Sequence, residues 1–257
     1  MRAAALLLAL GLAACGGGGG GDGPPTTNTT QQPVLRTLSV PSAQVGLTYD
    51  VTVYTPAGYA TSTNNKPIIY ALDHELEFAQ VRQAVEMFGI DAIIVSVGNL
   101  GSARRFIDFD LPGAEPYMRF LTLELIPLIE AQYRVDHARR TLMGYSLSGL
   151  AAVITLLEEP PSNRYFSGYV ITDPSLQFHT QELYQMEQRM WDTSHSLPVT
   201  AHHCSTAASG PYVDFPTAIK ARGYTGLHYQ FRVYTLDHGA VLGPCVQEGL
   251  RYVFGLG

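Results

Sequence analysis

Residues 140–149 read Arg-Thr-Leu-Met-Gly-Tyr-Ser-Leu-Ser-Gly, and this stretch decides the fold. A short strand pattern at 140–143 leads into Gly144, and an apolar helix pattern follows at 150–157. A serine on a sharp turn between a strand and a helix stands clear of the sheet edge, where its hydroxyl can act as a nucleophile. The position two after the serine is Ser148 instead of glycine, and serine is still small enough to let neighbouring backbones approach. The stretch therefore predicts a nucleophile at Ser146.

Segments with strand and helix patterns alternate on both sides of this turn. Strands are predicted from residue alternation or short apolar runs, at 48–54, 67–72, 92–97, 168–172, 198–202 and 229–234. Helices are predicted from apolar spacing, at 117–132, 216–222 and 246–253. This order predicts the α/β class, with a mostly parallel central sheet covered by helices on both faces. Together with the serine turn, it indicates the α/β-hydrolase fold.

The order of the chain predicts the partners of the nucleophile. On this fold the acid follows the serine and the histidine comes last. His238 is the last histidine, it follows a predicted strand, and Gly239 lets its loop turn. We therefore expect His238 to accept the Ser146 proton and return it to the leaving group.

The acid of the predicted triad is less sharply defined by the sequence. Asp214 follows a strand and is separated from His238 by one helix and one strand, which makes it the first choice. Its position before a helix also suits an N-cap. Asp173 and Asp192 are the alternatives, whereas Asp237 is expected to be solvated beside the histidine.

The tetrahedral intermediate of acyl transfer needs two backbone N–H donors. Leu147, directly after the nucleophile, is expected to supply one of them. His74, in the loop after the strand at 67–72, is expected to supply the other. Tyr145 lies next to the nucleophile and is expected to contact substrate.

The first 15 residues carry an export signal. Arg2 precedes a short apolar run at 3–12, and Ala13-Ala14-Cys15 follows, as in a secretory signal with a small-residue cleavage site. The run is shorter than the roughly 20 residues that a membrane-spanning helix needs. Residues 1–15 are therefore predicted to be a lipoprotein signal peptide with lipidation at Cys15. A plain signal peptide with a coincidental cysteine is the alternative.

The remaining chain divides into a linker and one domain. Residues 16–33 consist almost entirely of Gly, Pro, Thr, Asn and Gln, which predicts a disordered linker. Residues 34–257 are predicted to form a single α/β-hydrolase domain. The protein is expected in the cell envelope, at the periplasmic or outer-membrane face, touching the membrane only through the anchor. A formal net charge of −6 and a pI near 5.7 argue against nucleic acid as a partner.

Two further cysteines, Cys204 and Cys245, form an even pair in an oxidising compartment, which favours a disulfide over two buried free thiols. No metal is expected, because the adjacent His202, His203 and Cys204 of a strand point to opposite faces and cannot share one ion.

Several segments resemble the Putative esterase family, which includes esterase D and the periplasmic trilactone-siderophore esterases. The resemblance covers most of the domain and is carried by Pro67-Ile-Ile-Tyr-Ala-Leu-Asp73, Arg104-Arg-Phe-Ile-Asp108-Phe, Glu124-Leu-Ile-Pro-Leu-Ile-Glu130, the 140–149 stretch, Asp173-Pro-Ser-Leu176 and Asp237-His-Gly239. It implies that Ser146 and His238 are catalytic. This chain has His74 where the family usually has glycine, and it lacks the acid expected of the siderophore branch after residue 203.

The resemblance also bears on Arg105, which is expected to bind an acidic group of the substrate or, alternatively, to pair with Asp108 or Asp110. The leading hypothesis for function is hydrolysis of a small-molecule carboxylic ester through an acyl-Ser146 intermediate, with no metal or organic cofactor. Acyl transfer to an alcohol by the same residues is one alternative. A catalytically inactive, surface-tethered binding protein is another. The oligomeric state is not indicated by the sequence.

Overall fold

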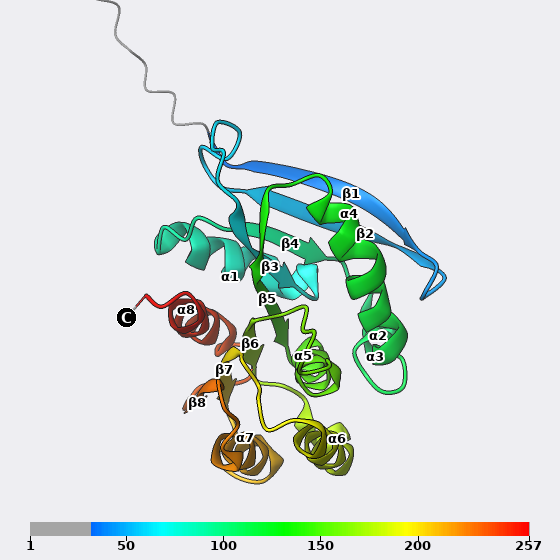
Figure 1. Cartoon of the computed structure of the whole chain (residues 1–257), viewed down its shortest axis with the longest axis vertical. Coiled ribbons are helices and arrows are strands. Elements are labelled where there is room, and N and C mark those ends of the chain that lie inside the picture. Colours follow the sequence, from blue (N-terminus) through cyan, green and yellow to red (C-terminus); the bar gives the residue numbers. More distant parts are fainter. Residues whose placement is uncertain (1–31, 257) are drawn as a thin grey trace, which may run out of the picture. The chain divides into compact units, whose positions relative to one another are not determined.

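A computed structural model describes residues 32–256 and places the Ser146 turn at the middle of an eight-stranded sheet (Figure 1). The strand order is β1-β2-β4-β3-β5-β6-β7-β8. β1 and β2 run antiparallel to their neighbours, and the other strands are parallel. The strands are β1 (Val34–Ser42), β2 (Leu47–Thr55), β3 (Lys66–Ala71), β4 (Ile93–Val97), β5 (Val135–Tyr145), β6 (Gly168–Thr172), β7 (Thr200–Ser205) and β8 (His228–Val233). This arrangement confirms the predicted α/β-hydrolase class.

Helices cover both faces of the sheet. They are α1 (His74–Met87), α2 (Ser102–Asp108), α3 (Ala114–Arg119), the π-helix η1 (Phe120–Leu125), α4 (Ile126–Glu130), α5 (Leu147–Glu158), the 3-10 helix η2 (Leu176–Phe178), α6 (Thr180–Thr193), α7 (Pro211–Arg222) and α8 (Leu242–Val253). Figure 1 shows α1 and α8 on one side of the sheet, with α5, α6 and the α2–α4 segment on the other.

The core consists of two apolar layers separated by the sheet. Ile68 and Tyr70 of β3 belong to one layer, and Ile69 and Ala71 belong to the other. Successive side chains of a strand point to opposite faces, so a strand buried on both faces needs a continuous apolar run. This explains why the central strands are easy to recognise in the sequence.

Some elements differ from the sequence-based expectations. The edge strand β1 and the helices α1, α2 and α6 were not predicted. The helix expected at 117–132 is interrupted by the π-helical turn of η1. Helix α7 begins at Pro211 instead of residue 216, because Pro is well tolerated in the first helical turn. Asp214 therefore lies inside a helix and not in a loop.

Cys204 of β7 and Cys245 of α8 are joined by a disulfide, which is the pairing expected from the sequence. Their Cα atoms are 6.2 Å apart, and both residues are fully buried. The bond attaches the start of α8 to the sheet.

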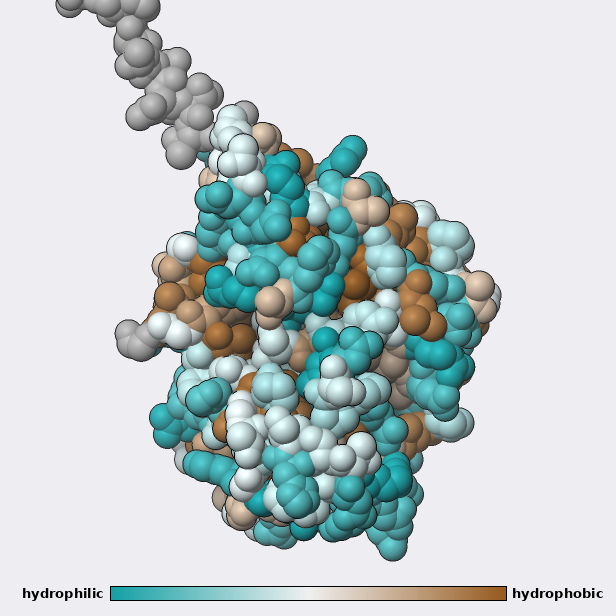
Figure 2. Space-filling model, in the orientation of Figure 1, coloured by the Kyte–Doolittle hydropathy of each residue, from teal (hydrophilic) through white to brown (hydrophobic). Residues whose placement is uncertain are grey.

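Apolar side chains on the face drawn in Figure 2 occur as small groups separated by polar ones. None of the helices within residues 32–256 is long and apolar enough to cross a membrane. The predicted signal peptide, the lipidated Cys15 and nearly all of the predicted linker lie outside the described residues.

Candidate active site

Ser146 occupies the sharp turn between β5 and α5. Its backbone has φ of +60°, a region that non-glycine residues rarely adopt and that is typical of strained functional turns. The turn is tight because a Cβ at Gly144 would lie 2.1 Å from the backbone oxygen of Ser148. Glycine is therefore required two positions before the nucleophile. The adjacent strand secures the turn, since the Ser146 N–H donates to the Thr172 oxygen at 3.0 Å.

His238 lies in the loop before α8 and contacts a carboxylate through Nδ1. The Nδ1 atom is 2.6 Å from Oδ2 of Asp173. When Nδ1 carries the proton and donates a hydrogen bond to Asp173, Nε2 is left free to act as a base. The imidazole is half exposed, and the carboxylate is only 5% exposed.

Asp173 directly follows β6, the strand next to the nucleophile strand, and has φ of +40°. Thr206 donates its backbone N–H to Oδ1 and its hydroxyl to Oδ2, each at 2.8 Å. Burial raises the pKa of the Asp173 carboxyl, but the hydrogen bonds from His238 and Thr206 outweigh this effect and leave the pKa below its ordinary value. Asp173 is therefore a carboxylate at neutral pH.

The prediction that Asp214 orients the histidine is wrong, since Asp173 occupies that position. Asp214 lies exposed in the first turn of α7. Asp192 is also exposed and accepts a hydrogen bond from Gln188. Asp237 is exposed, as expected, and accepts from the backbone of Ala240.

Asp173 and Thr206 had a recognisable signal in the sequence. Each follows a buried strand at its carboxyl end, β6 for Asp173 and β7 for Thr206. The carboxyl ends of parallel strands form the edge at which α/β proteins place their sites. The chain order of serine, acid and histidine also holds for Asp173.

Tyr145 contacts the backbone and ring of His238. Its hydroxyl donates to the backbone oxygen of His238 at 2.7 Å, and the two rings stack with centroids 4.8 Å apart. Burial and the nearby Asp173 charge raise the pKa of Tyr145 to about 12, so the hydroxyl remains a donor. The geometry gives this residue a role in holding the histidine. Tyr145 does not line the cavity at Ser146, so the substrate contact expected from the sequence stays a prediction.

The two residues expected to donate to an oxyanion each begin a helix. Leu147 is the first residue of α5 and His74 is the first residue of α1. The first N–H groups of a helix have no partner within it and carry partial positive charge. The His74 ring stacks on Phe78 and does not line the cavity described below.

Arg105 pairs with neither of the acids named as alternatives. Its Nε donates to Oδ2 of Asp73 at 2.7 Å, while Arg104 pairs with Asp108. Asp73 is fully buried and also accepts a hydrogen bond from Asn99. Arg105 nevertheless is one of the residues that line the cavity at Ser146.

Ser146, Leu147, Asp173 and His238 line one cavity of about 450 Å³. The hydroxyl of Ser146 lies 3.4 Å from the hydroxyl of Ser175, which lines the same space. This cavity combines a strained serine with a histidine–carboxylate pair, the groups needed for nucleophilic catalysis.

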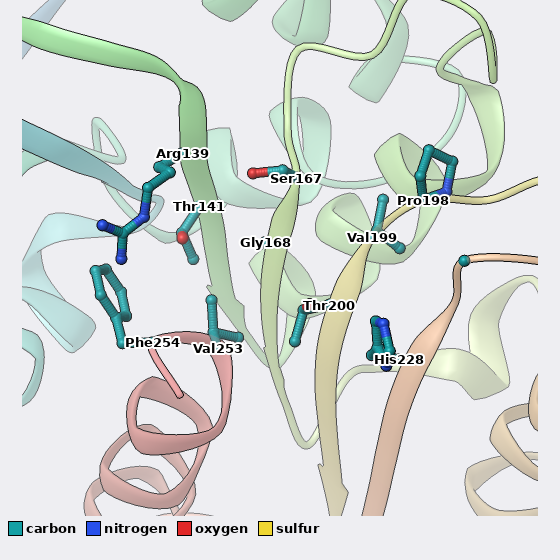
Figure 3. Close-up of a pocket in the computed structure, with 11 residues that line it drawn as sticks. Arg139, Thr141, Ser167, Gly168, Pro198, Val199, Thr200, His228, Val253 and Phe254 are labelled. Atoms are coloured by element: carbon teal, nitrogen blue, oxygen red, sulfur yellow. The ribbon is translucent and has the colours of Figure 1, made fainter. Parts of the chain in front are cut away.

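A second cavity, of about 280 Å³, lies at the opposite ends of the strands (Figure 3). Gly168, Thr200 and His228 line it at the first residues of β6, β7 and β8, and Thr141 lines it from within β5. Its lining contains no carboxylate, so His228 has no acid partner there. No cluster of His, Cys, Asp and Glu with the geometry of a metal site occurs within residues 32–256.

Fold and site define an α/β-hydrolase with a serine–histidine–aspartate constellation. The family model described as Putative esterase matches residues 42–220, and the chain belongs to this family. The resemblance inferred from the sequence is thereby confirmed.

The chain is similar to the ferri-bacillibactin esterase BesA of Bacillus subtilis (strain 168), with 31% identity over 155 residues. The match covers 48% of this chain and 50% of BesA, so it spans about half the length of that relative.

Among solved structures, an IroE-like serine hydrolase from Shewanella oneidensis superimposes with a TM-score of 0.75 at 20% identity, covering 86% of this chain and 80% of the other. The BES protein from Bacillus cereus gives 0.74 at 20% identity, covering 85% and 95%. At this level of identity the structural likeness shows the fold alone.

Proposed function

We propose that the protein hydrolyses a small-molecule carboxylic ester through an acyl-Ser146 intermediate. The observation that carries this proposal is the 2.6 Å contact between Asp173 and His238 beside a cavity that also contains the strained Ser146 turn. Membership of the Putative esterase family supports ester hydrolysis as the reaction.

In the first half of the reaction, Ser146 Oγ attacks the ester carbonyl carbon and its proton passes to Nε2 of His238. The negative oxygen of the tetrahedral intermediate accepts hydrogen bonds from the Leu147 and His74 N–H groups. The carbon–oxygen ester bond then breaks, and His238 gives the proton to the departing alcohol oxygen. Asp173 stabilises the imidazolium formed between these two transfers.

In the second half, water attacks the acyl-serine and transfers a proton to His238. The bond to Ser146 Oγ breaks, the serine recovers its proton from His238, and the carboxylic acid leaves. The half-exposed imidazole and the open cavity give water access to this step.

We also propose that the substrate carries an aromatic group. Phe106 and Phe178 line the cavity, are 54% and 48% exposed, and meet edge to face with centroids 6.4 Å apart. Large exposed aromatic rings at a cavity offer a packing surface for another ring. The name of BesA, an esterase of ferri-bacillibactin, places ferric siderophore esters among the compounds to be tested.

The test is labelling and turnover of the purified full chain. Wild type is expected to hydrolyse nitrophenyl esters and to gain one fluorophosphonate adduct on Ser146, read by intact mass and peptide mapping. Ser146→Ala should lose the adduct and about 10⁴-fold or more in kcat. Ser39→Ala, at an exposed serine of β1, serves as the matched control. A wild type that neither labels nor turns over would contradict the proposal and favour the tethered-binder alternative.

For localisation, we propose export and lipidation at Cys15. The disulfide of Cys204 and Cys245 supports an oxidising compartment, because such bonds persist mainly outside the cytosol. Expression in a bacterial host should give a membrane-bound form that incorporates labelled palmitate. Cys15→Ser should be released in soluble form without label. Palmitate incorporation that persists in Cys15→Ser would contradict lipidation at this residue.

A further inference from the structure

Glu77 is a buried carboxyl beneath the Ser146 turn that the proposed reaction does not use. It lies on α1 and is 1% exposed. Its Oε1 atom is 2.8 Å from Oγ of Ser148, which is itself fully buried. A buried ionisable group is costly unless it is neutral or well partnered, so this position calls for a physical reason.

The hydrogen-bond pattern around Ser148 indicates where the protons are. The Tyr145 N–H donates to Ser148 Oγ at 2.9 Å. Ser148 Oγ also lies 2.8 Å from the Tyr145 backbone oxygen and 2.8 Å from Glu77. A hydroxyl has one proton to donate. An ionised Glu77 would compete with the Tyr145 oxygen for that proton, whereas a neutral Glu77 donates to Ser148 and lets all three contacts be hydrogen bonds at once.

This network acts on the two residues that flank the chemistry. Ser148 holds both the N–H and the oxygen of Tyr145, the residue immediately before the nucleophile. Tyr145 in turn holds His238 through its ring and hydroxyl. Fixing the Tyr145 backbone therefore fixes the start of the strained turn at Ser146 and one support of the base.

The same contact ties two helices together. Glu77 belongs to the first turn of α1, which begins at His74, and Ser148 belongs to the first turn of α5, which begins at Leu147. These helix starts carry the two proposed oxyanion donors. A hydrogen bond between Glu77 and Ser148 limits how far the two donors can separate.

We propose that Glu77 is a positioning residue that, as a neutral carboxyl, donates a hydrogen bond to Ser148 and so holds the nucleophile turn and the oxyanion donors in register. The proposal rests on the proposed function for its kinetic readout. It identifies Ser148, the residue that departs from the usual glycine of the serine motif, as the acceptor on which this arrangement depends.

The surroundings of Glu77 favour its neutral form. Burial raises the pKa of the Glu77 carboxyl well above its usual range, and the nearby Asp73 carboxylate raises it further. The contacts with Ser148 and Tyr145 and the Arg105 charge act in the opposite direction without restoring the ordinary value.

The kinetic test compares Glu77→Gln with Glu77→Leu. The Gln amide can donate to Ser148 as a neutral carboxyl does, whereas Leu fills the space without donating. Glu77→Leu is expected to lower kcat by about 10²-fold with little change in KM, because small displacements of catalytic groups cost rates of that order. Glu77→Gln is expected to recover most of the lost rate. Glu86→Leu, at an exposed glutamate of α1 that pairs with Arg82, is the matched control.

A folded Glu77→Leu protein with wild-type kcat, or a Glu77→Gln protein as slow as Glu77→Leu, would overturn the proposal. If Glu77→Leu does not fold, the comparison moves to Ser148→Ala. With the acceptor removed, kcat should fall about as far as expected for Glu77→Leu, and Gln and Glu at position 77 should then give equal rates, because coupled residues are not additive. Unequal rates in that background would count against the hydrogen bond.

An infrared difference spectrum, wild type minus Glu77→Gln, provides a readout independent of turnover. A neutral Glu77 contributes the carbonyl stretch of a protonated carboxyl at neutral pH, at higher frequency than the carboxylate bands. A carboxylate band there instead would overturn the proposal even in an active enzyme. Absence of wild-type turnover and labelling would overturn the proposed function alone.

Discussion

Oδ2 of Asp173 and Nδ1 of His238 lie 2.6 Å apart although 65 positions separate the two residues in the chain. Asp173 is held at the end of β6 by Thr206, and His238 is held by Tyr145. The pair is therefore fixed from both sides before any substrate arrives. Such preorganisation avoids the cost of arranging the groups during the reaction.

The first prediction separates the two candidate acids. Asp173→Asn should lower kcat by about 10³–10⁴-fold, because an amide in that position favours the wrong histidine tautomer. Asp214→Asn should stay within about two-fold of wild type, since Asp214 is exposed on α7. Ester turnover with matched thermal melts checks both variants. A large loss in Asp214→Asn with an active Asp173→Asn would reverse the assignment.

Acid should remove a stabilising contribution of Asp173. Its pKa in the folded protein lies below the value of about 3.9 expected when unfolded. The contribution is therefore fully present above about pH 4 and is lost as the pH falls through the folded pKa. Urea unfolding from pH 7 to pH 3 should show the stability gap between wild type and Asp173→Asn constant at first and narrowing below about pH 4. A difference in unfolding free energy that grows as the pH falls would contradict a lowered pKa for Asp173.

The disulfide should stabilise the fold and the histidine loop. Cys204 and Cys245 are 41 positions apart, a loop length for which the chain-entropy model gives about 4 kcal/mol as an upper value. Cys204→Ala combined with Cys245→Ala should lower the free energy of unfolding by roughly 2–4 kcal/mol. Turnover should fall as well, because α8 starts just after His238 and Asp173 N–H bonds to the Cys204 oxygen. Cys15→Ser, which leaves the disulfide intact, is the control. Equal free energies of unfolding for wild type, the double variant and Cys15→Ser would contradict the prediction.

Phe178 should influence the choice of acyl group. Phe178→Ala is expected to lower kcat/KM for methyl cinnamate roughly 2- to 10-fold more than for methyl butyrate, because aromatic contacts of this kind contribute about 0.5–1.5 kcal/mol. Leu123→Ala, at an exposed leucine of η1, provides the control for surface truncation. Equal losses on both esters would leave the aromatic preference without support.

Local chemistry in the sequence was enough to determine the central architecture. The strands buried on both faces show as continuous apolar runs, and the strand–turn–helix context around Ser146 follows from neighbouring residues alone. The chain order placed His238 last, and the even cysteine pair predicted the disulfide. The first two of these features depend on residue patterns within a short segment, and the last two depend on chain order and on the number of cysteines.

Tertiary structure alone decided which carboxylate meets His238. Asp173 and Asp214 both follow a strand and both lie between the serine and the histidine in the sequence. The choice depends on β6 lying next to the nucleophile strand and on α7 starting early enough to carry Asp214 to the surface. The contact of Arg105 with Asp73 and the contact of Glu77 with Ser148 likewise could not be predicted from the sequence. The first joins residues 32 positions apart in the chain, and the second joins residues 71 positions apart. Contacts at that range are set by how the helices pack on the sheet, and no local pattern in the chain encodes them.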